Sequence, residues 1–295
     1  MTAEIAAPVK RDGCRLGIWM TAFICIFQLG TLVMLLVTAV VLKKLKLELA
    51  GDAPLYIASD LSQLLAGSLL FLFFLRNRSR MQSIPVPKQG KTRQLLFTLP
   101  ALFGWNLSVT AIDAFFQSFF HFSLSGVPET QTCSPFIMLV TAALFPAVAE
   151  ELIFRGILYR YLRQHGIAFA AITSSLLFGM VHLNFLQLFF TFGMGLLLCS
   201  LYENTGTIGW GMLLHFLNNA LSIVLSADWI NAELCNRIQV VLGAIVLPFL
   251  LVLLIRYCRK CEKQSFAQIR SFFATIPMML FTALCLAFCI FMTEH

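Results

Sequence analysis

The stretch Ala149-Glu150-Glu151-Leu152-Ile153-Phe154-Arg155 places two carboxylates and a guanidinium inside a long apolar run. Ionisable side chains in a membrane segment are costly, and they usually pair with one another or face a cavity. On a helix, Glu151 and Arg155 are four residues apart and share a face, so we expect them to form an ion pair. Glu150 lies about 100° round the helix from Glu151 and needs a partner from another segment. The stretch therefore predicts a structural pair beside a candidate site residue.

The composition around this stretch is typical of a membrane protein. Of the 295 residues, 59% are apolar and 12% are charged. A spanning helix needs about 20 mostly apolar residues. The candidate segments are residues 16–42, 54–75, 95–120, 135–159, 167–184, 186–202, 208–226, 238–255 and 271–292. The fifth, sixth and seventh are short and one could be re-entrant, so the sequence predicts an all-α, polytopic membrane bundle of about eight or nine transmembrane helices.

The net charge of +7 is distributed in a way that excludes nucleic-acid binding as the main role. Of the 21 Lys and Arg residues, 17 fall near the N-terminus and in alternate connections between the apolar segments. The other four are Lys43, Lys44, Lys46 and Arg237. Because cytoplasmic loops carry the excess of basic residues, this bias predicts a cytoplasmic N-terminus and a C-terminus on the opposite side. The first apolar run is expected to be a retained anchor.

The positions of the linkers and of the polar residues predict that the chain is divided into three parts. Residues 1–94 form an N-terminal transmembrane hairpin followed by a basic cytoplasmic linker, which contains Pro85 and Pro87. Residues 95–226 form the core that contains the polar motifs, and residues 227–295 form a C-terminal hairpin. Cys133 and Cys235 fall in predicted external connections, where two free thiols are favoured over a disulfide.

Two further motifs occur in the apolar runs that follow. Phe178 and His182 are four residues apart and share a helix face, as do His215 and Asn219. Glu150 lies 16 residues before Gly166 and His182 lies 16 after it. A helical hairpin that turns at Gly166 would therefore bring the carboxylate and the imidazole to the same depth.

The residue types in these motifs suit water-driven hydrolysis of an amide. A carboxylate and an imidazole, here Glu150 and His182, can take a proton from water and pass it to the leaving amine. The tetrahedral oxyanion then needs fixed hydrogen-bond donors. His215 and Asn219 could supply an imidazole N–H and an amide NH₂ from one face.

Together the motifs resemble those of the CAAX prenyl protease and bacteriocin-processing (CPBP) intramembrane proteases. The EExxxR motif corresponds to Glu150 through Arg155, FxxxH to Phe178 through His182, and HxxxN to His215 through Asn219, in the family's order. The resemblance covers roughly residues 135–226. It implies that Glu150 and His182 activate water and that His215 and Asn219 hold the oxyanion. Glu151, Arg155 and Phe178 are expected to support the site.

The resemblance also implies an intramembrane endopeptidase that acts on a membrane-embedded or membrane-associated peptide within the lipid bilayer. The compact chain is more similar to bacterial members, so we expect a protein of the bacterial cell membrane. A metal-independent glutamate protease is favoured, because an amide is a poor zinc ligand and no HExxH-type pair is present. Zinc at Glu150, His182 and His215 is the alternative.

Two other functional classes stay open at the level of sequence. Membrane Glu and His residues also build proton relays in transporters, although no second EExxxR-like segment indicates the repeated halves that many transporters have. The family resemblance also includes non-catalytic membrane proteins of the bacteriocin self-immunity or abortive-infection type. A complete set of four polar residues favours retained chemistry.

Overall fold

The computed structural model describes residues 3–46, 51–87, 92–120, 133–225, 231–260 and 263–293. Throughout these ranges the regular structure is helical and no strand is formed, which confirms the predicted all-α class. The elements are α1 (Ala3–Leu45), α2 (Ala53–Arg76), α3 (Arg78–Gln82), η1 (Thr92–Gln94), α4 (Leu95–Phe120), α5 (Pro135–Met138), η2 (Leu139–Leu144), α6 (Phe145–Glu151), η3 (Leu152–Tyr159), α7 (Arg160–Leu162), η4 (Arg163–His165), α8 (Ile167–Met180), α9 (Phe185–Thr205), α10 (Gly209–Leu225), α11 (Ala232–Lys260), α12 (Lys263–Phe273) and α13 (Ile276–Thr293).

Each predicted membrane segment contains a helix, but the helices differ in length. Among the described residues, six helices are long and apolar enough to cross a membrane. A seventh span is formed if α12 and α13 count as one, and these two helices are bent by 81° at their junction. The remaining two apolar helices, α8 and α10, are shorter, with 14 and 17 residues. The structure is therefore the polytopic membrane bundle that the composition predicts.

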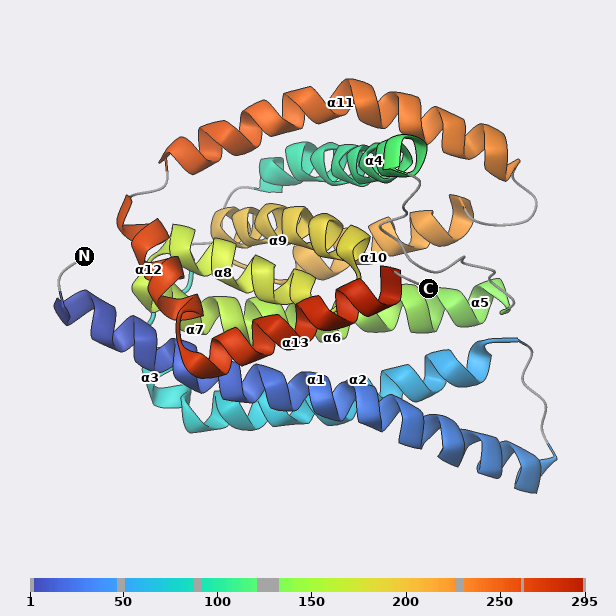
Figure 1. The fold of residues 1–295 in the computed structure, drawn as a ribbon, viewed down its shortest axis with the longest axis horizontal. Helices are drawn as coiled ribbons and strands as arrows, with labels where there is room; N and C mark the ends of the chain where they lie inside the picture. Colours follow the sequence, from blue (N-terminus) through green and yellow to red (C-terminus); the bar gives the residue numbers. More distant parts are fainter. Residues whose placement is uncertain are drawn as a thin grey trace.

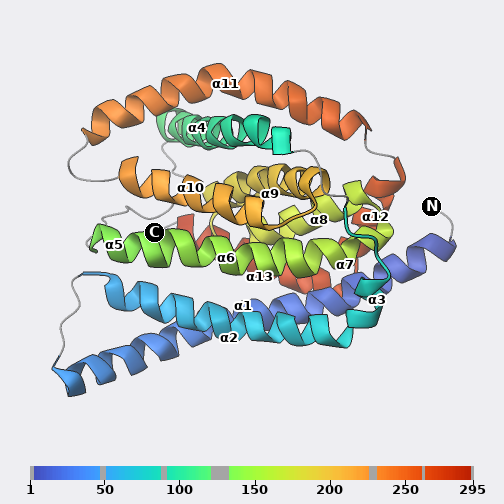
Figure 2. The ribbon, with the colours of Figure 1, turned by 180° about the vertical axis from the view of Figure 1, so that it is seen from behind.

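The helix that contains the two adjacent glutamates runs through the middle of the bundle (Figures 1 and 2). It extends from α5 to η4 as one apolar stretch, Pro135–His165. Helices α4 and α11 pack together along one edge of the bundle, and α1 and α2 pack together along the opposite edge. α1 also packs on α12 and α13, so the first and last helices of the chain are neighbours.

The backbone changes its helical form on both sides of the glutamates. η2 and η3 are π-helical, and α6 lies between them with Glu150 and Glu151 at its end. Pro146 lies at the start of α6, where it has no backbone N–H to donate. Short π-helical segments are rare and are frequent at functional sites, because they rotate the following side chains relative to an ideal α-helix.

The hairpin between the first and second motifs of the site departs in one respect from expectation. Gly166 adopts a positive φ of 117° and caps the start of α8, as predicted for a turn at that residue. However, α8 ends at Met180, so the prediction that His182 lies within the helix is wrong. Leu183 takes a left-handed φ of 56°, and the Asn184 side chain caps α9 by accepting a hydrogen bond from Gln187 N at 3.0 Å. His182 therefore lies in the tight turn between α8 and α9.

Candidate functional site

A cavity of about 810 Å³ lies between α2, α4, α6, α9 and α10. Glu150, His182, His215 and Asn219 all line it, so the structure brings the four predicted site residues to one space. Glu150 comes from α6, His182 from the turn after α8, and the other two from one face of α10. The hairpin at Gly166 thus brings the carboxylate and the imidazole to one cavity, as the sequence spacing predicts.

The Glu150 carboxylate has partners from two other helices. Its Oε1 accepts a hydrogen bond from Gln63 Nε2 of α2 at 3.2 Å, and its Oε2 lies 3.7 Å from His215 Nε2. The side chain is 12% exposed, whereas that of Glu151 is 1% exposed. The expectation that Glu150 contacts another segment is confirmed, but its contacts are to Gln63 and His215, and it shares only the cavity with His182.

Glu151 and Arg155 form the predicted ion pair inside the protein. Arg155 Nη1 donates to Glu151 Oε1 at 2.7 Å, and both side chains are at most 2% exposed. The Arg155 guanidinium also lies over the Phe178 ring, 4.6 Å from its centroid, at a distance typical of a cation–π contact. The arginine of the first motif is therefore packed against the phenylalanine of the second.

His215 joins this buried pair to the cavity. Its Nδ1 lies 3.2 Å from Glu151 Oε1, the same oxygen that accepts from Arg155. A carboxylate beside a guanidinium is an acceptor, so this nitrogen carries a proton and donates it. The other nitrogen, Nε2, is then directed to the Glu150 side of the ring.

The hydrogen bond of His182 determines which of its nitrogens is protonated. Nδ1 lies 2.8 Å from the Phe178 carbonyl oxygen, which can only accept a hydrogen bond. Nδ1 therefore carries the proton. In the neutral ring, Nε2 is the acceptor, as a general base requires.

A chain of side-chain amides holds Asn219. Asn106 Nδ2 of α4 donates to Asn218 Oδ1 at 3.3 Å, and Asn218 Nδ2 donates to Asn219 Oδ1 at 3.4 Å. Asn219 Nδ2 in turn donates to the Ala142 carbonyl oxygen of η2 at 3.4 Å. In this arrangement the Asn219 amide oxygen accepts from Asn218, and the amide nitrogen donates to Ala142. One N–H of that nitrogen is left for another acceptor.

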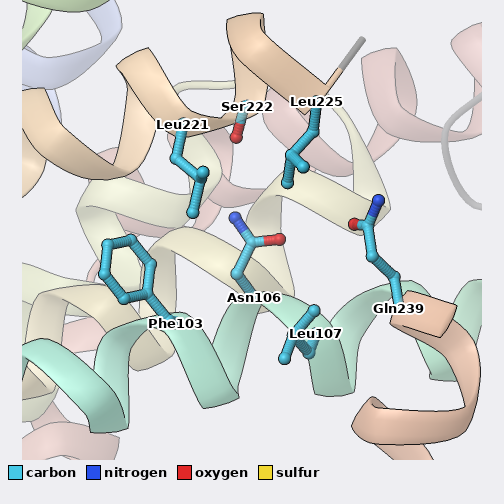
Figure 3. Close-up of a pocket in the computed structure, with 7 residues that line it drawn as sticks. All are labelled: Phe103, Asn106, Leu107, Leu221, Ser222, Leu225 and Gln239. Carbon is cyan, nitrogen blue, oxygen red and sulfur yellow. The ribbon is translucent and has the colours of Figure 1, made fainter. Parts of the chain in front are cut away.

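Asn106 also lines a smaller pocket beside the main cavity. This pocket has a volume of about 240 Å³ and lies between α4, α10 and α11. In Figure 3 the Asn106 amide points from α4 toward Ser222 of α10, and leucines of both helices flank it. Asn106 and Ser222 line both spaces, so the pocket adjoins the cavity.

Three residues with contacts to the site, Gln63, Asn106 and Asn218, are absent from the sequence-based prediction. Asn218 lies outside the face that His215 and Asn219 share, yet it is 1% exposed and bonds to Asn219. For Gln63 a signal exists in the sequence: Tyr56, Asp60 and Gln63 recur at helical spacing on one face of α2. Tyr56 lines the cavity and Gln63 donates to Glu150, so this face is directed to the site.

The alternative zinc set can be compared with the geometry. Among the described residues, no group of three His, Cys, Asp or Glu side chains is arranged to hold a metal ion. This includes Glu150, His182 and His215. Cys133 and Cys235 are both free thiols. The arrangement of Glu150, His182 and His215 does not fit a metal ion.

Comparisons with known proteins agree with the motifs. A family model described as Type II CAAX prenyl endopeptidase Rce1-like matches residues 132–221, a range that contains all three motifs. The chain is 25% identical over 115 residues to "Putative membrane peptidase YdiL" of Bacillus subtilis (strain 168). That alignment covers 38% of this chain and 47% of the relative, so the chain spans about half of the relative's length. No solved structure matches the chain.

The family model and the relative both concern membrane peptidases, and the chain has the apolar helices of a membrane protein. The predicted resemblance to the CPBP family of intramembrane proteases is therefore confirmed.

Proposed function

From this resemblance to the CPBP family, we propose that the chain is an intramembrane endopeptidase that hydrolyses a peptide bond of a membrane-associated protein or peptide. The observation that carries the proposal is that Glu150, His182, His215 and Asn219 line one cavity inside an apolar bundle. Hydrolysis of a peptide bond requires a base for water, donors for the oxyanion and an acid for the leaving amine, and these four side chains can supply all three.

In the proposed reaction, Glu150 and His182 act on a water molecule in the cavity. The unprotonated Nε2 of His182 or the Glu150 carboxylate takes the proton, and the resulting hydroxide attacks the carbonyl carbon of the substrate. The same groups then return a proton to the amine nitrogen as the C–N bond breaks. Each such proton transfer contributes about 10²- to 10⁴-fold in rate. Gln63 keeps the carboxylate oriented by donating to Oε1.

His215 and Asn219 are the proposed donors to the oxyanion. Asn219 has one N–H beyond the bond to Ala142, and the amide chain from Asn106 fixes the direction of that group. His215 donates through Nε2 when both ring nitrogens are protonated. Fixed donors of this kind are effective because they need no reorganisation while the charge develops.

Glu151, Arg155 and Phe178 are proposed to position the site. Glu151 holds His215 through Nδ1, Arg155 neutralises Glu151, and Phe178 packs on the guanidinium. None of these three residues lines the cavity. Their contribution is therefore expected in stability and in the orientation of His215.

The test compares the membrane peptides of cells that express the wild type with those of cells that express Glu150→Gln. Peptides that appear only with the wild type would be products, and they would also identify the substrate. The matched control is Glu233→Gln, because Glu233 is 76% exposed in a surface pair with Arg237. We expect the control to give the wild-type products. Identical peptides from the wild type and Glu150→Gln would refute proteolysis and would favour a non-catalytic binding role.

A further inference from the structure

Along the central helix, the cavity lies on only one side of the candidate site. On the central helix its lining residues are Met138, Ala142, Pro146 and Glu150, a regular series from the first helical residues to the glutamate. At 1.5 Å per residue this series is about 18 Å long. No described residue beyond Glu150 on the central helix lines the cavity.

The lining residues of α10 and α2 extend in the same direction. On α10 the lining begins at His215 and reaches Ile223, close to the end of the helix at Leu225. On α2 it consists of Leu55 and Tyr56 in the first turn, together with Asp52 just before the helix. The cavity therefore extends from the site to the end of the bundle where α1 ends and α2 begins. This is the right-hand end in Figure 1.

The other side of the site is filled by packed side chains. Phe154, Arg155, Leu158, Tyr159 and Phe178 are all at most 2% exposed. These residues separate the site from the opposite end of the bundle.

Polar contacts also tie the helices together at that opposite end. The Asp12 carboxylate of α1 accepts hydrogen bonds from Arg80, Tyr161 and Gln164, which connects α1 to α3, α7 and η4. The carboxylate is fully buried. We call this the closed end, and the end with Leu55 the open end.

The basic residues are divided unequally between the two ends. Basic residues at the closed end are Lys10, Arg11, Arg15, Arg76, Arg78 and Arg80, and Arg160 and Arg163 follow on the central helix. The open end has Lys43, Lys44 and Lys46 at the end of α1 and Arg237 near the start of α11. Since basic residues accumulate on the cytoplasmic side of a membrane, the closed end is cytoplasmic and the open end is extracytoplasmic.

We infer that the site receives both water and substrate from the extracytoplasmic side. The substrate class that fits is a peptide segment presented at or just inside the outer surface of the membrane, such as the external juxtamembrane segment of a membrane-anchored protein. The lining suits an extended peptide, because it combines apolar side chains such as Leu55, Met138 and Phe190 with amides such as Asn106 and Asn218. The substrate part of this inference rests on the proposed function.

The route can be tested without any activity. In a variant whose nine cysteines are replaced by serine or alanine, single cysteines are introduced as Leu55→Cys, Ala142→Cys and Ser83→Cys. Leu55 is 47% exposed at the open end, Ala142 lines the cavity two turns above Glu150, and Ser83 is exposed at the closed end. Intact cells are treated with a small, charged, membrane-impermeant thiol reagent before and after permeabilisation. Thermal stability of each purified variant checks that it is folded.

We expect Leu55→Cys and Ala142→Cys to react in intact cells and Ser83→Cys to react only after permeabilisation. Reaction of Ala142→Cys only after permeabilisation, together with Ser83→Cys, would overturn the inference by indicating a cytoplasmic route. Failure of Ala142→Cys to react under either condition would also overturn it, because the cavity would then be closed to water. Labelling does not depend on turnover, so a positive result combined with identical membrane peptides from the wild type and Glu150→Gln would refute the proposed function alone.

Discussion

Arg155 and Arg237 each pair with a glutamate four residues earlier, but the two pairs differ in burial. The Arg155 and Glu151 side chains are 2% and 1% exposed, whereas those of Arg237 and Glu233 are 74% and 76% exposed. Removing one partner of a buried pair leaves an uncompensated charge in an apolar environment. Solvent replaces the lost partner of an exposed pair.

Arg155→Ala should therefore destabilise the protein by about 3 to 5 kcal/mol, by the usual cost of breaking a buried pair. Arg237→Ala should cost at most about 1 kcal/mol. Thermal unfolding of the two purified variants in one detergent measures the difference. Normal stability of Arg155→Ala combined with zero turnover would contradict the structural role and would assign the guanidinium to the reaction.

Asn219 provides a test of the oxyanion assignment. Asn219→Asp nearly keeps the shape of the side chain but replaces a donor with an anion that faces the developing charge. Turnover should fall at least as much as in Asn219→Ala, for which we expect a loss of roughly 10²- to 10³-fold. Initial rates of the two variants on one substrate decide the order. Wild-type activity of Asn219→Asp would rule out a donor role and would return the third motif to helix packing.

At the scale of elements, the close approach of α10 to the central helix keeps His215 beside Glu151. A Cβ added at Gly211 would lie 3.0 Å from Glu151 Oε2, which is closer than ordinary contact. At Gly209, two residues earlier on the same helix, the nearest atom to an added Cβ is Thr207 Oγ1 at 3.5 Å, which is ordinary contact. Of these two glycines, only Gly211 is required by the position of the Glu151 carboxylate.

Gly211→Ala is expected to displace the Glu151 carboxylate and, through it, the His215 ring. Turnover should fall by about 10-fold or more, since displacement of site groups by 1 Å can cost roughly 10²-fold. Gly209→Ala should retain the wild-type rate. Rates and thermal stabilities of both variants, compared side by side, measure the effect. Equal activity of the two variants would mean that the carboxylate adjusts without consequence for His215.

The elements themselves were largely predictable, because apolar length and helical spacing are local properties of a sequence. The ion pair of Glu151 with Arg155 follows from a spacing of four, and the turn follows from Gly166. The end of α8 before His182 was not predicted, because it depends on the left-handed Leu183 and on the Asn184 cap within an apolar run. The contacts of Gln63 and Asn106 with the site arise from helix packing across long sequence separations, which spacing along the chain does not report.

At the scale of the whole molecule, the four site residues reach one cavity from three separate parts of the chain, and this arrangement bears on the question of metal. The alternative zinc set would need Glu150, His182 and His215 to converge, whereas no three such side chains among the described residues are arranged to hold a metal ion.

Activity of the detergent-purified protein should therefore survive incubation with a strong chelator. Elemental analysis should find less than one zinc per chain. A true site of two histidines and a glutamate would bind zinc tightly and in a pH-dependent manner. Loss of activity on chelation that is reversed by added zinc would overturn the metal-independent assignment.

The central claim is that Glu150 moves protons in a hydrolytic reaction inside the bundle. Glu150→Gln keeps the size of the side chain and its polar contact with Gln63 but removes the base. The decisive measurement is the cleavage rate of one identified membrane peptide by wild type, Glu150→Gln and the exposed control Glu233→Gln, each purified and reconstituted in liposomes. We predict that Glu150→Gln loses about 10²- to 10⁴-fold in rate while binding of the peptide persists, and that the control equals wild type. Cleavage by Glu150→Gln at the wild-type rate would contradict the account.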